Sequence, residues 1–518
     1  MTTNERKCQS GVIETLQSLI VAFVLAMVFR GFVVEGFVIP TGSMAPTLLG
    51  QHLLKHSDQT GQDFPVGFDP RRSVSPDKFS DPLLGRNIPL SMSEAKKLEP
   101  RAGDRVVVLK TLFPFFGPER FDVVVFKNPT DTQGLSANYI KRLIGLPGET
   151  LWIADGDIFA KRGDDAFVIQ RKPEHVQRAL WMRVSDSDAI PTDMLALSRP
   201  WRGPPWTGNP QSAWNYENRM WVCNTSEPSS LVWDQNKIHI DDWSSYNMLM
   251  PKQRQKPVSD IRVSATITPE SEKITASFTL QAIGHQFQWL LSNDSSSLVV
   301  RTLSGELVQK VEFDCTCFEN NIPTRVEFWH ADQMMSLYID GERIGTLLYN
   351  FSPEERLRFA ANVVDSVPIE DIATRSGKDA KLTLQFDGSP LAITRLQVDR
   401  DLYYRSSPLP SIATKNPTAS GNESLVKAGS PAFGTYPKLA VLGKDQFMMA
   451  GDNSAYSLDG RLWGNPDEFV ATQIDDAPFV VHRNLLIGKA WSVYWPAALK
   501  HVDRIPLIPD FGRIRFIR

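Results

Sequence analysis

The sequence has few cysteines, little net charge and only one long apolar run. It contains four cysteines in 518 residues and carries a formal net charge of −3. So few cysteines exclude a disulfide scaffold or a dense zinc cluster. A near-neutral chain has no basic surface for wrapping nucleic acid, so we expect no nucleic-acid partner. The hydrophobic content of 42% is typical of folded domains, and the length predicts about three domains, or two with a large insertion.

The one long apolar run lies near the N-terminus, at residues 11–31, and is densest at 19–29. With its flanking residues it reaches the about 20 residues that a helix needs to cross a bilayer. A cleaved signal peptide and a buried core helix are the alternatives. The start is only weakly basic, and no clear small-residue cleavage site follows. We therefore predict a single-pass anchor at 11–31, a cytoplasmic tail at 1–10, and the rest of the chain on the outer side.

Composition divides the remaining chain into segments at 32–160, 161–230, 231–405, 406–435 and 436–518. The first and last carry β-branched strand patterns bounded by Gly or Pro, and a polar, proline-rich excursion at 51–100 interrupts the first. The second is rich in Trp and Pro and is predicted to be irregular. Regular short strands with Asp-Gly turns make the third a predicted β-sandwich. The fourth reads as a linker, so the fold class is mainly β with an inserted sandwich.

A serine lies on a rigid bend directly after the apolar run. Ser43 follows Gly42, which allows a tight turn, and Pro40 and Pro46 fix φ on either side. An ordinary turn is one interpretation. The other is a nucleophile, which requires a base. The chain has no G-x-S-x-G motif, and none of its eight histidines lies in a patterned context with a carboxylate, so histidine is not the expected base.

Lys141 is the candidate base. It lies between apolar neighbours in residues 139–148 (YIKRLIGLPG), on a predicted strand. An unperturbed lysine with a pKa of about 10.4 cannot accept a proton near neutrality. Burial lowers a lysine pKa, and a value of about 7.5 would require about 4 kcal/mol of differential burial. A plain surface lysine on a strand is the alternative interpretation.

A third segment, residues 449–464 (MAGDNSAYSLDGRLWG), combines turn formers at 451–453 with hydroxyls and an Asp459/Arg461 pair. We call residues 40–46 the serine turn and residues 139–148 the lysine strand. Together with these two segments, the third segment resembles the bacterial type I signal peptidases, which are Ser/Lys endopeptidases. The resemblance covers roughly a third of the chain. It implies a signal-peptidase β-fold that removes signal peptides from exported preproteins after small residues (Ala-x-Ala type). The implied location is the outer side of the bacterial cytoplasmic membrane.

The resemblance also implies roles for individual residues. Ser43 would be the nucleophile, and Lys141 the general base that later protonates the leaving amine. The oxyanion hole would combine the Ser43 backbone N–H with the Thr41 hydroxyl, and Ser457 would orient the lysine. The implied supporting pairs are Arg142 with Asp452 and Asp459 with Arg461. The positions that match the substrate pockets are Phe37, Ile39, Tyr139 and Ile140.

The implied partners are signal peptides, the lipid bilayer and the secretion machinery, with no metal or organic cofactor. An extended substrate would be held by β-augmentation beside the pocket residues. Two other classes stay open. One is a membrane-tethered glycan-binding or adhesion protein on an inactive peptidase scaffold, against which intact Ser43, Lys141 and Ser457 argue. The other is a self-cleaving Ser/Lys repressor, which would require a DNA-binding helix-turn-helix that is not visible in the sequence.

The insertion is the main departure from the family pattern. Within it, residues 231–405 resemble concanavalin A-like (laminin G or glucanase-like) jelly rolls, which implies a glycan site or a structural, substrate-gating appendage. Cys315 and Cys317 would lie about 6.8 Å apart on an extended strand, which is marginal for a bridge. We therefore expect both to be unpaired, with a bridge from Cys223 to one of them as the alternative.

Overall fold

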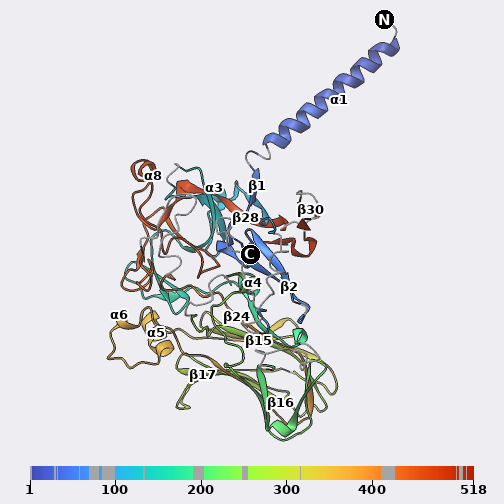
Figure 1. Ribbon diagram of the computed structural model, residues 1–518, viewed down its shortest axis with the longest axis vertical. Coiled ribbons are helices and arrows are strands. Elements are labelled where there is room, and N and C mark those ends of the chain that lie inside the picture. Colours follow the sequence, from blue (N-terminus) through green and yellow to red (C-terminus); the bar gives the residue numbers. More distant parts are fainter. Residues whose placement is uncertain are drawn as a thin grey trace, which may run out of the picture.

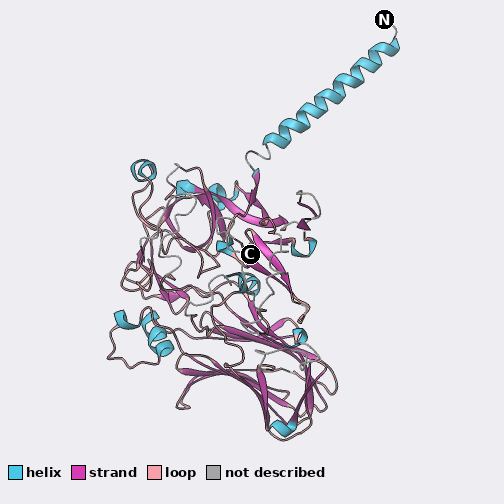
Figure 2. Cartoon of the chain, viewed as in Figure 1, coloured by secondary structure: helices cyan, strands magenta, loops and turns pink. Residues whose placement is uncertain are grey.

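The fold was obtained as a computed structural model of the chain (Figure 1). It describes residues 3–28, 31, 33–57, 59–68, 81–84, 100–131, 135–190, 203–247, 255–315, 317–409, 426–496, 499–500, 506–508 and 510–518. Strands dominate these residues (Figure 2), which confirms the mainly β class. Most of the predicted linker at 406–435 and most of the excursion at 51–100 lie outside the described residues.

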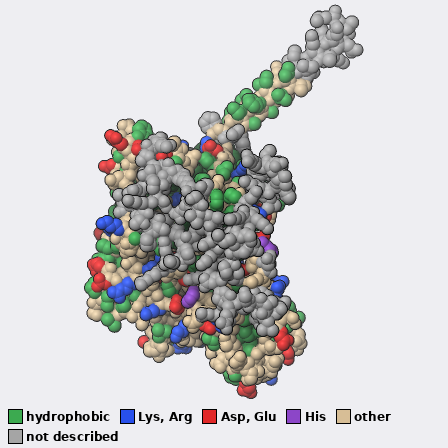
Figure 3. All heavy atoms as spheres, in the orientation of Figure 1, with side chains coloured by type: hydrophobic (Ala, Val, Ile, Leu, Met, Phe, Trp, Pro, Cys, Tyr) green, Lys and Arg blue, Asp and Glu red, His purple; other side chains and the backbone are tan. Residues whose placement is uncertain are grey.

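Helix α1 (Thr3–Val28) extends away from the rest of the chain (Figure 1). Its described side chains are exposed, including Leu19 and Phe23, and Figure 3 shows apolar side chains along it. Within the described part of the chain, however, no helix combines the length and the apolar composition needed to cross a membrane. The predicted anchor at 11–31 is therefore not supported. Its uninterrupted apolar stretch within α1, residues 19–28, is about half of the required length.

The first sheet joins the two ends of the sequence. Its strands, in spatial order, are β1 (Val34–Val38), β4 (Arg105–Leu109), β28 (Leu486–Trp495), β5 (Val123–Lys127), β6 (Asn138–Gly145), β26 (Gln446–Ala450) and β27 (Val481–His482), and β31 (Arg515–Phe516) pairs with β28. All pairs are antiparallel. Valines of β4 and β5 are buried between the sheet and its neighbours, as β-branched residues favour. The sheet therefore brings the segments before and after the insertion side by side.

Smaller elements flank this sheet. A second sheet has the order β25 (Ala440–Val441), β7 (Glu149–Ala154), β8 (Asp157–Arg162) and β9 (Val168–Ile169). The hairpins are β2 (His52–His56) with β3 (Asp63–Gly67), within the predicted excursion, and β29 (Leu499–Lys500) with β30 (Pro506–Ile508). The short helices are α3 (Leu112–Phe116), α4 (Glu174–Leu180), α5 (Pro353–Ala361), α6 (Ile369–Ile372) and α8 (Glu468–Gln473).

The insertion forms two further antiparallel sheets. One has the order β12 (Trp214–Glu217), β13 (Met220–Cys223), β24 (Leu391–Arg400), β15 (Ile261–Pro269), β20 (Thr324–Ala331), β21 (Met334–Ile339) and β22 (Glu342–Leu348), with β10 (Met182–Asp186) beside β24. The other has the order β11 (Trp206–Asn209), β14 (Ser229–Trp233), β23 (Lys381–Asp387), β16 (Thr275–Ala282), β17 (His285–Ser292), β18 (Ser296–Thr302) and β19 (Leu307–Phe313). One hydrophobic core contains side chains from both sheets.

Two predictions about the insertion were wrong. The described residues of the segment at 161–230, namely 161–190 and 203–230, are not irregular, because β10 to β13 lie there and join the two sheets of the insertion. Their tryptophans are buried in the shared core, where large side chains fill the space between the sheets. Cys315 and Cys317 form a disulfide, with Cα atoms 5.3 Å apart. The two cysteines follow the end of β19, so the extended-strand spacing does not apply to them. Cys223 is buried and unpaired.

Candidate active site

Ser43 and Lys141 come together although 98 residues separate them in the sequence. Ser43 lies in the short 3₁₀ helix η2 (Gly42–Met44), and Lys141 lies on β6. The Lys141 Nζ is 2.6 Å from the Ser43 Oγ and also donates to the Ile140 carbonyl oxygen at 3.1 Å. Such a distance allows direct proton transfer between amine and hydroxyl.

Burial changes the chemistry of this lysine. Lys141 is only 4% exposed. Removal of its amine from water lowers the pKa of Lys141 from 10.5 to about 8, although the carboxylates of Asp459 and Asp452 oppose the shift. Desolvation disfavours the charged form of an amine, and this effect is larger here than the attraction of the nearby carboxylates. A substantial fraction of the amine is therefore neutral, and able to accept a proton, near pH 8.

Asp452 connects the lysine strand to the serine turn. Its carboxylate accepts two hydrogen bonds from Arg142, at 2.8 Å from Nε and 2.7 Å from Nη2, and both side chains are fully buried. It also accepts from the Thr47 hydroxyl at 2.5 Å. A bidentate pair of this kind fixes both partners in orientation. Arg142 follows Lys141 on β6, so the pair holds that strand against the turn.

Asp459 and Arg461 form the second buried pair. The Arg461 Nε and Nη2 lie 2.9 and 2.7 Å from the two carboxylate oxygens of Asp459. Burial alone would raise the pKa of Asp459, but the charge and hydrogen bonds of Arg461 hold it below its usual value. The same carboxylate accepts from the Gly451 N–H at 2.8 Å. The pair therefore shapes the loop that follows β26.

Ser457 is fully buried beside this loop. Its hydroxyl interacts with the Asp459 carboxylate and contributes to holding the pKa of that carboxyl below its usual value. A Cβ atom on Gly451 would lie 2.2 Å from the Ser457 Oγ and 2.4 Å from the Ser43 carbonyl oxygen. Gly451 is thus the contact point between the two serines, which explains why no side chain fits there.

The four positions matched to substrate pockets lie on two strands and the segment after β1. Ile39 is buried, and Phe37 and Ile140 pack against the same hydrophobic cluster. Tyr139 packs against Phe126 and Trp463, with ring centroids 6.4 Å apart in each case. Thr41 is exposed and extended, with φ of −124°.

One strand edge is open near Ser43 and Lys141. β1 pairs with β4 alone and forms the end of the sheet among the described strands. Exposed main-chain groups at a strand edge are the ordinary docking site for an extended peptide.

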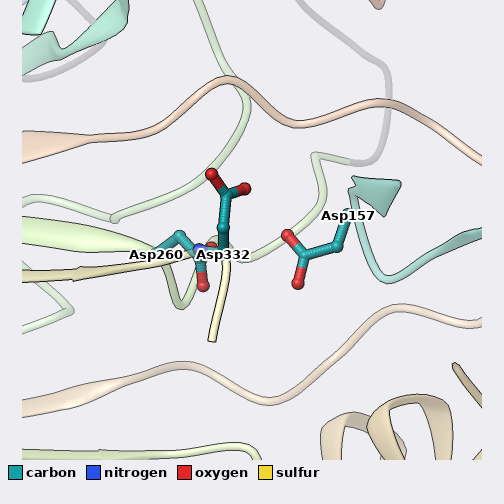
Figure 4. A group of neighbouring side chains, drawn as sticks. All are labelled: Asp157, Asp260 and Asp332. Carbon is teal, nitrogen blue, oxygen red and sulfur yellow. The ribbon is translucent and has the colours of Figure 1, made fainter. Parts of the chain in front are cut away.

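A carboxylate cluster lies away from the dyad, where β8 meets the insertion. Asp157, Asp260 and Asp332 each bring an oxygen within 4.8 Å of the others (Figure 4). Arg356 contacts Asp157 at 3.4 Å and Asp260 at 3.1 Å. Lys172 contacts Asp332 at 2.5 Å. Side-chain cations already balance part of this charge, so the cluster is a buried ion network between β8 and the inserted sheets.

Sequence reasoning missed three residues at the serine turn. Asn453 donates from its side chain to the Gly42 carbonyl oxygen and from its backbone to the Ser43 carbonyl oxygen. From the insertion, Tyr246 contacts the same turn at Gly42, and Asn247 pairs with Asn453. The motif at 449–464 contained Asn453, which could have been identified from it. No sequence pattern links residues 246–247 to residue 43, because only the fold brings them together.

Comparison with known proteins gives one family match and several partial relatives. Residues 86–175 match the family described as signal peptidase, peptidase S26. The chain is 27% identical over 158 residues to signal peptidase I of Rickettsia bellii, which covers 30% of this chain and 43% of that protein. It is 30% identical over 142 residues to signal peptidase I of Pseudomonas aeruginosa, which covers 27% and 34%. The matches support a type I signal peptidase, and the chain spans less than half the length of these curated relatives.

Comparison with solved structures gives only low TM-scores. The carbohydrate binding module CBM66 from Bacillus subtilis has a TM-score of 0.24 and 7% identity, over 38% of this chain and 97% of that chain. The galectin LEC-6 of Caenorhabditis elegans has a TM-score of 0.18 and 10% identity, over 28% and 82%. These scores do not establish a shared fold, so the concanavalin A-like class of the insertion stays a prediction.

Proposed function

We propose that the chain is a serine endopeptidase that cleaves signal peptides from exported preproteins after small residues. The observation that carries the proposal is the 2.6 Å contact between the Lys141 amine and the Ser43 hydroxyl, together with a lysine pKa lowered to about 8 by burial. The matches to the S26 family and to signal peptidases I support it independently.

In the proposed reaction, neutral Lys141 takes the proton from the Ser43 hydroxyl while Oγ bonds to the scissile carbonyl carbon. The Ser43 N–H and the Thr41 hydroxyl donate to the oxyanion that forms. The C–N bond then breaks, and the protonated Lys141 gives its proton to the leaving amine. Water attacks the resulting ester, loses a proton to Lys141 and releases the acid, and the proton returns to Oγ.

The proposed substrate is an extended peptide bound along the open edge of β1. That edge would pair with the main chain of the substrate. The pocket residues would accept small side chains one and three residues before the cleaved bond. A position on the outer side of the bacterial cytoplasmic membrane, with the bilayer and the secretion machinery as partners, belongs to this proposal and rests on the likeness to the family.

The test is cleavage of a preprotein with an Ala-x-Ala site by wild type, Ser43→Ala and Lys141→Ala, with the product N-terminus sequenced. We expect cleavage after the Ala-x-Ala site by wild type and a loss of at least about a thousandfold in both variants. Ser304→Ala and Lys444→Ala change exposed residues of the same types and serve as controls. Equal cleavage by all proteins would refute the dyad. A wild type that cleaves nothing would favour a binding protein on an inactive scaffold.

A further inference from the structure

The insertion reaches the serine turn through the short 3₁₀ helix η5 (Ser245–Asn247), which lies between β14 and β15. Tyr246 is 4% exposed, and its ring covers Gly42 so closely that a Cβ atom on Gly42 would lie 2.0 Å from it. The Tyr246 hydroxyl also donates to the Gln51 carbonyl oxygen at 3.1 Å. The turn that carries Ser43 is therefore packed against the insertion.

The next residue, Asn247, pairs with Asn453 through both side-chain amides. The Asn247 Nδ2 donates to the Asn453 Oδ1 at 2.6 Å, and the Asn453 Nδ2 donates to the Asn247 Oδ1 at 2.8 Å. A side-chain amide has two N–H donors. The Asn453 Nδ2 uses its second donor on the Gly42 carbonyl oxygen at 2.9 Å. Asn247 thus determines which side of the Asn453 amide faces the turn.

Asn453 in turn holds the main chain of the nucleophile. Its side chain binds the Gly42 carbonyl oxygen, and its backbone N–H donates to the Ser43 carbonyl oxygen at 3.1 Å. The Gly42 carbonyl and the Ser43 N–H belong to one planar trans peptide, so they point in opposite directions. Holding the carbonyl on one side therefore fixes the direction of the Ser43 N–H on the other.

We propose that the insertion supplies a positioning residue to the active site: Asn247 orients the Asn453 amide, which directs the Ser43 N–H toward the oxyanion. This inference rests on the proposed function, because the oxyanion exists only during peptide cleavage. Asn247 touches no reacting atom and acts through Asn453. Its loss therefore affects the transition state, where charge develops on the oxygen, more than substrate binding.

The test compares Asn247→Ala, Asn453→Ala and the double variant on an Ala-x-Ala preprotein. We expect Asn247→Ala to lower kcat about 10- to 100-fold with KM changed less than about threefold. The double variant should be no slower than Asn453→Ala, because one residue acts through the other. The pH at which kcat/KM is half-maximal should stay at the wild-type value, since Lys141 is untouched. Asn320→Ala, an exposed asparagine of the insertion, is the matched control.

Asn247→Asp guards against loss of folding. It is nearly isosteric and still accepts from the Asn453 Nδ2, but it cannot donate to the Asn453 Oδ1, so kcat should fall with the melting temperature near that of wild type. Wild-type kcat in both Asn247 variants would overturn the inference while leaving the Ser43 and Lys141 results standing. The inference would also be overturned if the losses of kcat in the two single variants multiplied in the double variant. A loss of kcat that is fully explained by a smaller fraction of protein with an active Ser43, measured by active-site titration, would overturn it as well. Cleavage that persists in Ser43→Ala would instead overturn the proposed function.

Discussion

At the scale of single residues, the decisive feature is a lysine whose amine is removed from water but still contacts a hydroxyl. Asp459 and Asp452 favour the charged amine, yet burial is the larger effect and brings the pKa of Lys141 down to about 8. The side chain extends from a central strand of a sheet and is only 4% exposed, and its amine donates to the Ser43 hydroxyl. The same position in a solvated strand would give an ordinary, protonated lysine.

This residue predicts the pH dependence of cleavage. In the proposed reaction the neutral amine accepts the serine proton, so kcat/KM should rise about tenfold per pH unit below pH 8 and level off above it. Initial rates on an Ala-x-Ala preprotein between pH 6 and 10 measure this profile. A midpoint near 10.5, the ordinary value for lysine, would mean that the amine is solvated in the working enzyme.

At the scale of elements, the site depends on strands that come from both sides of the insertion. β6 precedes it and β26 follows it, and the two pair at Arg142 and Ala450. The Arg142–Asp452 pair then ties β6 to the loop after β26, and Thr47 ties that loop to the serine turn. Three short segments distant in the sequence therefore become one rigid unit, although none has this shape alone.

Removing one partner of this pair predicts a large loss of stability. Asp452→Ala leaves the Arg142 charge fully buried without its carboxylate, so the free energy of unfolding should fall by about 3–5 kcal/mol. Asp445→Ala breaks the exposed pair with Arg483 and should cost less than about 1 kcal/mol. Urea denaturation of both variants measures the difference. Equal effects would contradict a structural role for the buried pair.

At the scale of the whole molecule, the insertion and the sheets outside it share one buried seam. Helices α5 and α6 of the insertion pack on β7 and β8 through the hydrophobic cluster that contains Trp152, Leu357 and Ile372. Beside it, Arg356 contacts Asp155 of the β7–β8 turn at 3.1 Å. Apolar and charged contacts therefore hold the insertion against β7 and β8, and η5 adds a further contact at the serine turn through Tyr246.

The seam predicts an unusual pH dependence of stability. Burial raises the pKa of Asp155 to about 6, although Arg356 opposes the shift. The folded state then binds a proton between about pH 4 and 6 that the unfolded state does not, so this group makes folding more favourable as the pH falls from 7 to 4. The contribution is up to about 3 kcal/mol.

Asp155→Asn removes this contribution, because the amide does not titrate. The melting temperature of the variant minus that of wild type should therefore be more positive at pH 7 than at pH 4.5. Asp165→Asn, at an exposed position on the loop after β8, should differ from wild type equally at both pH values. Calorimetry at the two pH values measures these differences. A pH-independent difference for Asp155→Asn would mean that Asp155 is already charged at low pH.

Much of the site could be predicted from local sequence. The serine between two prolines, the lysine among apolar neighbours and the Gly-Asp-Asn segment each carry a chemical signature, and the structure brings Ser43 and Lys141 within 2.6 Å. In the insertion, apolar residues alternate with polar ones at 261–267, a pattern that predicts a strand, and β15 lies there. The prediction of an irregular segment at 161–230 was wrong, because the many tryptophans and prolines obscured the alternating pattern of its strands.

The sequence by itself determined the residue types of the dyad, their order and the mainly β class, because these depend on side-chain chemistry and on short-range periodicity. The tertiary structure alone decided that Tyr246 of the insertion contacts the serine turn, that Asn247 pairs with Asn453, and that Asp155 meets Arg356 across the seam. The physical reason is distance along the chain: contacts between segments that lie about 200 residues apart leave no periodic trace in either segment.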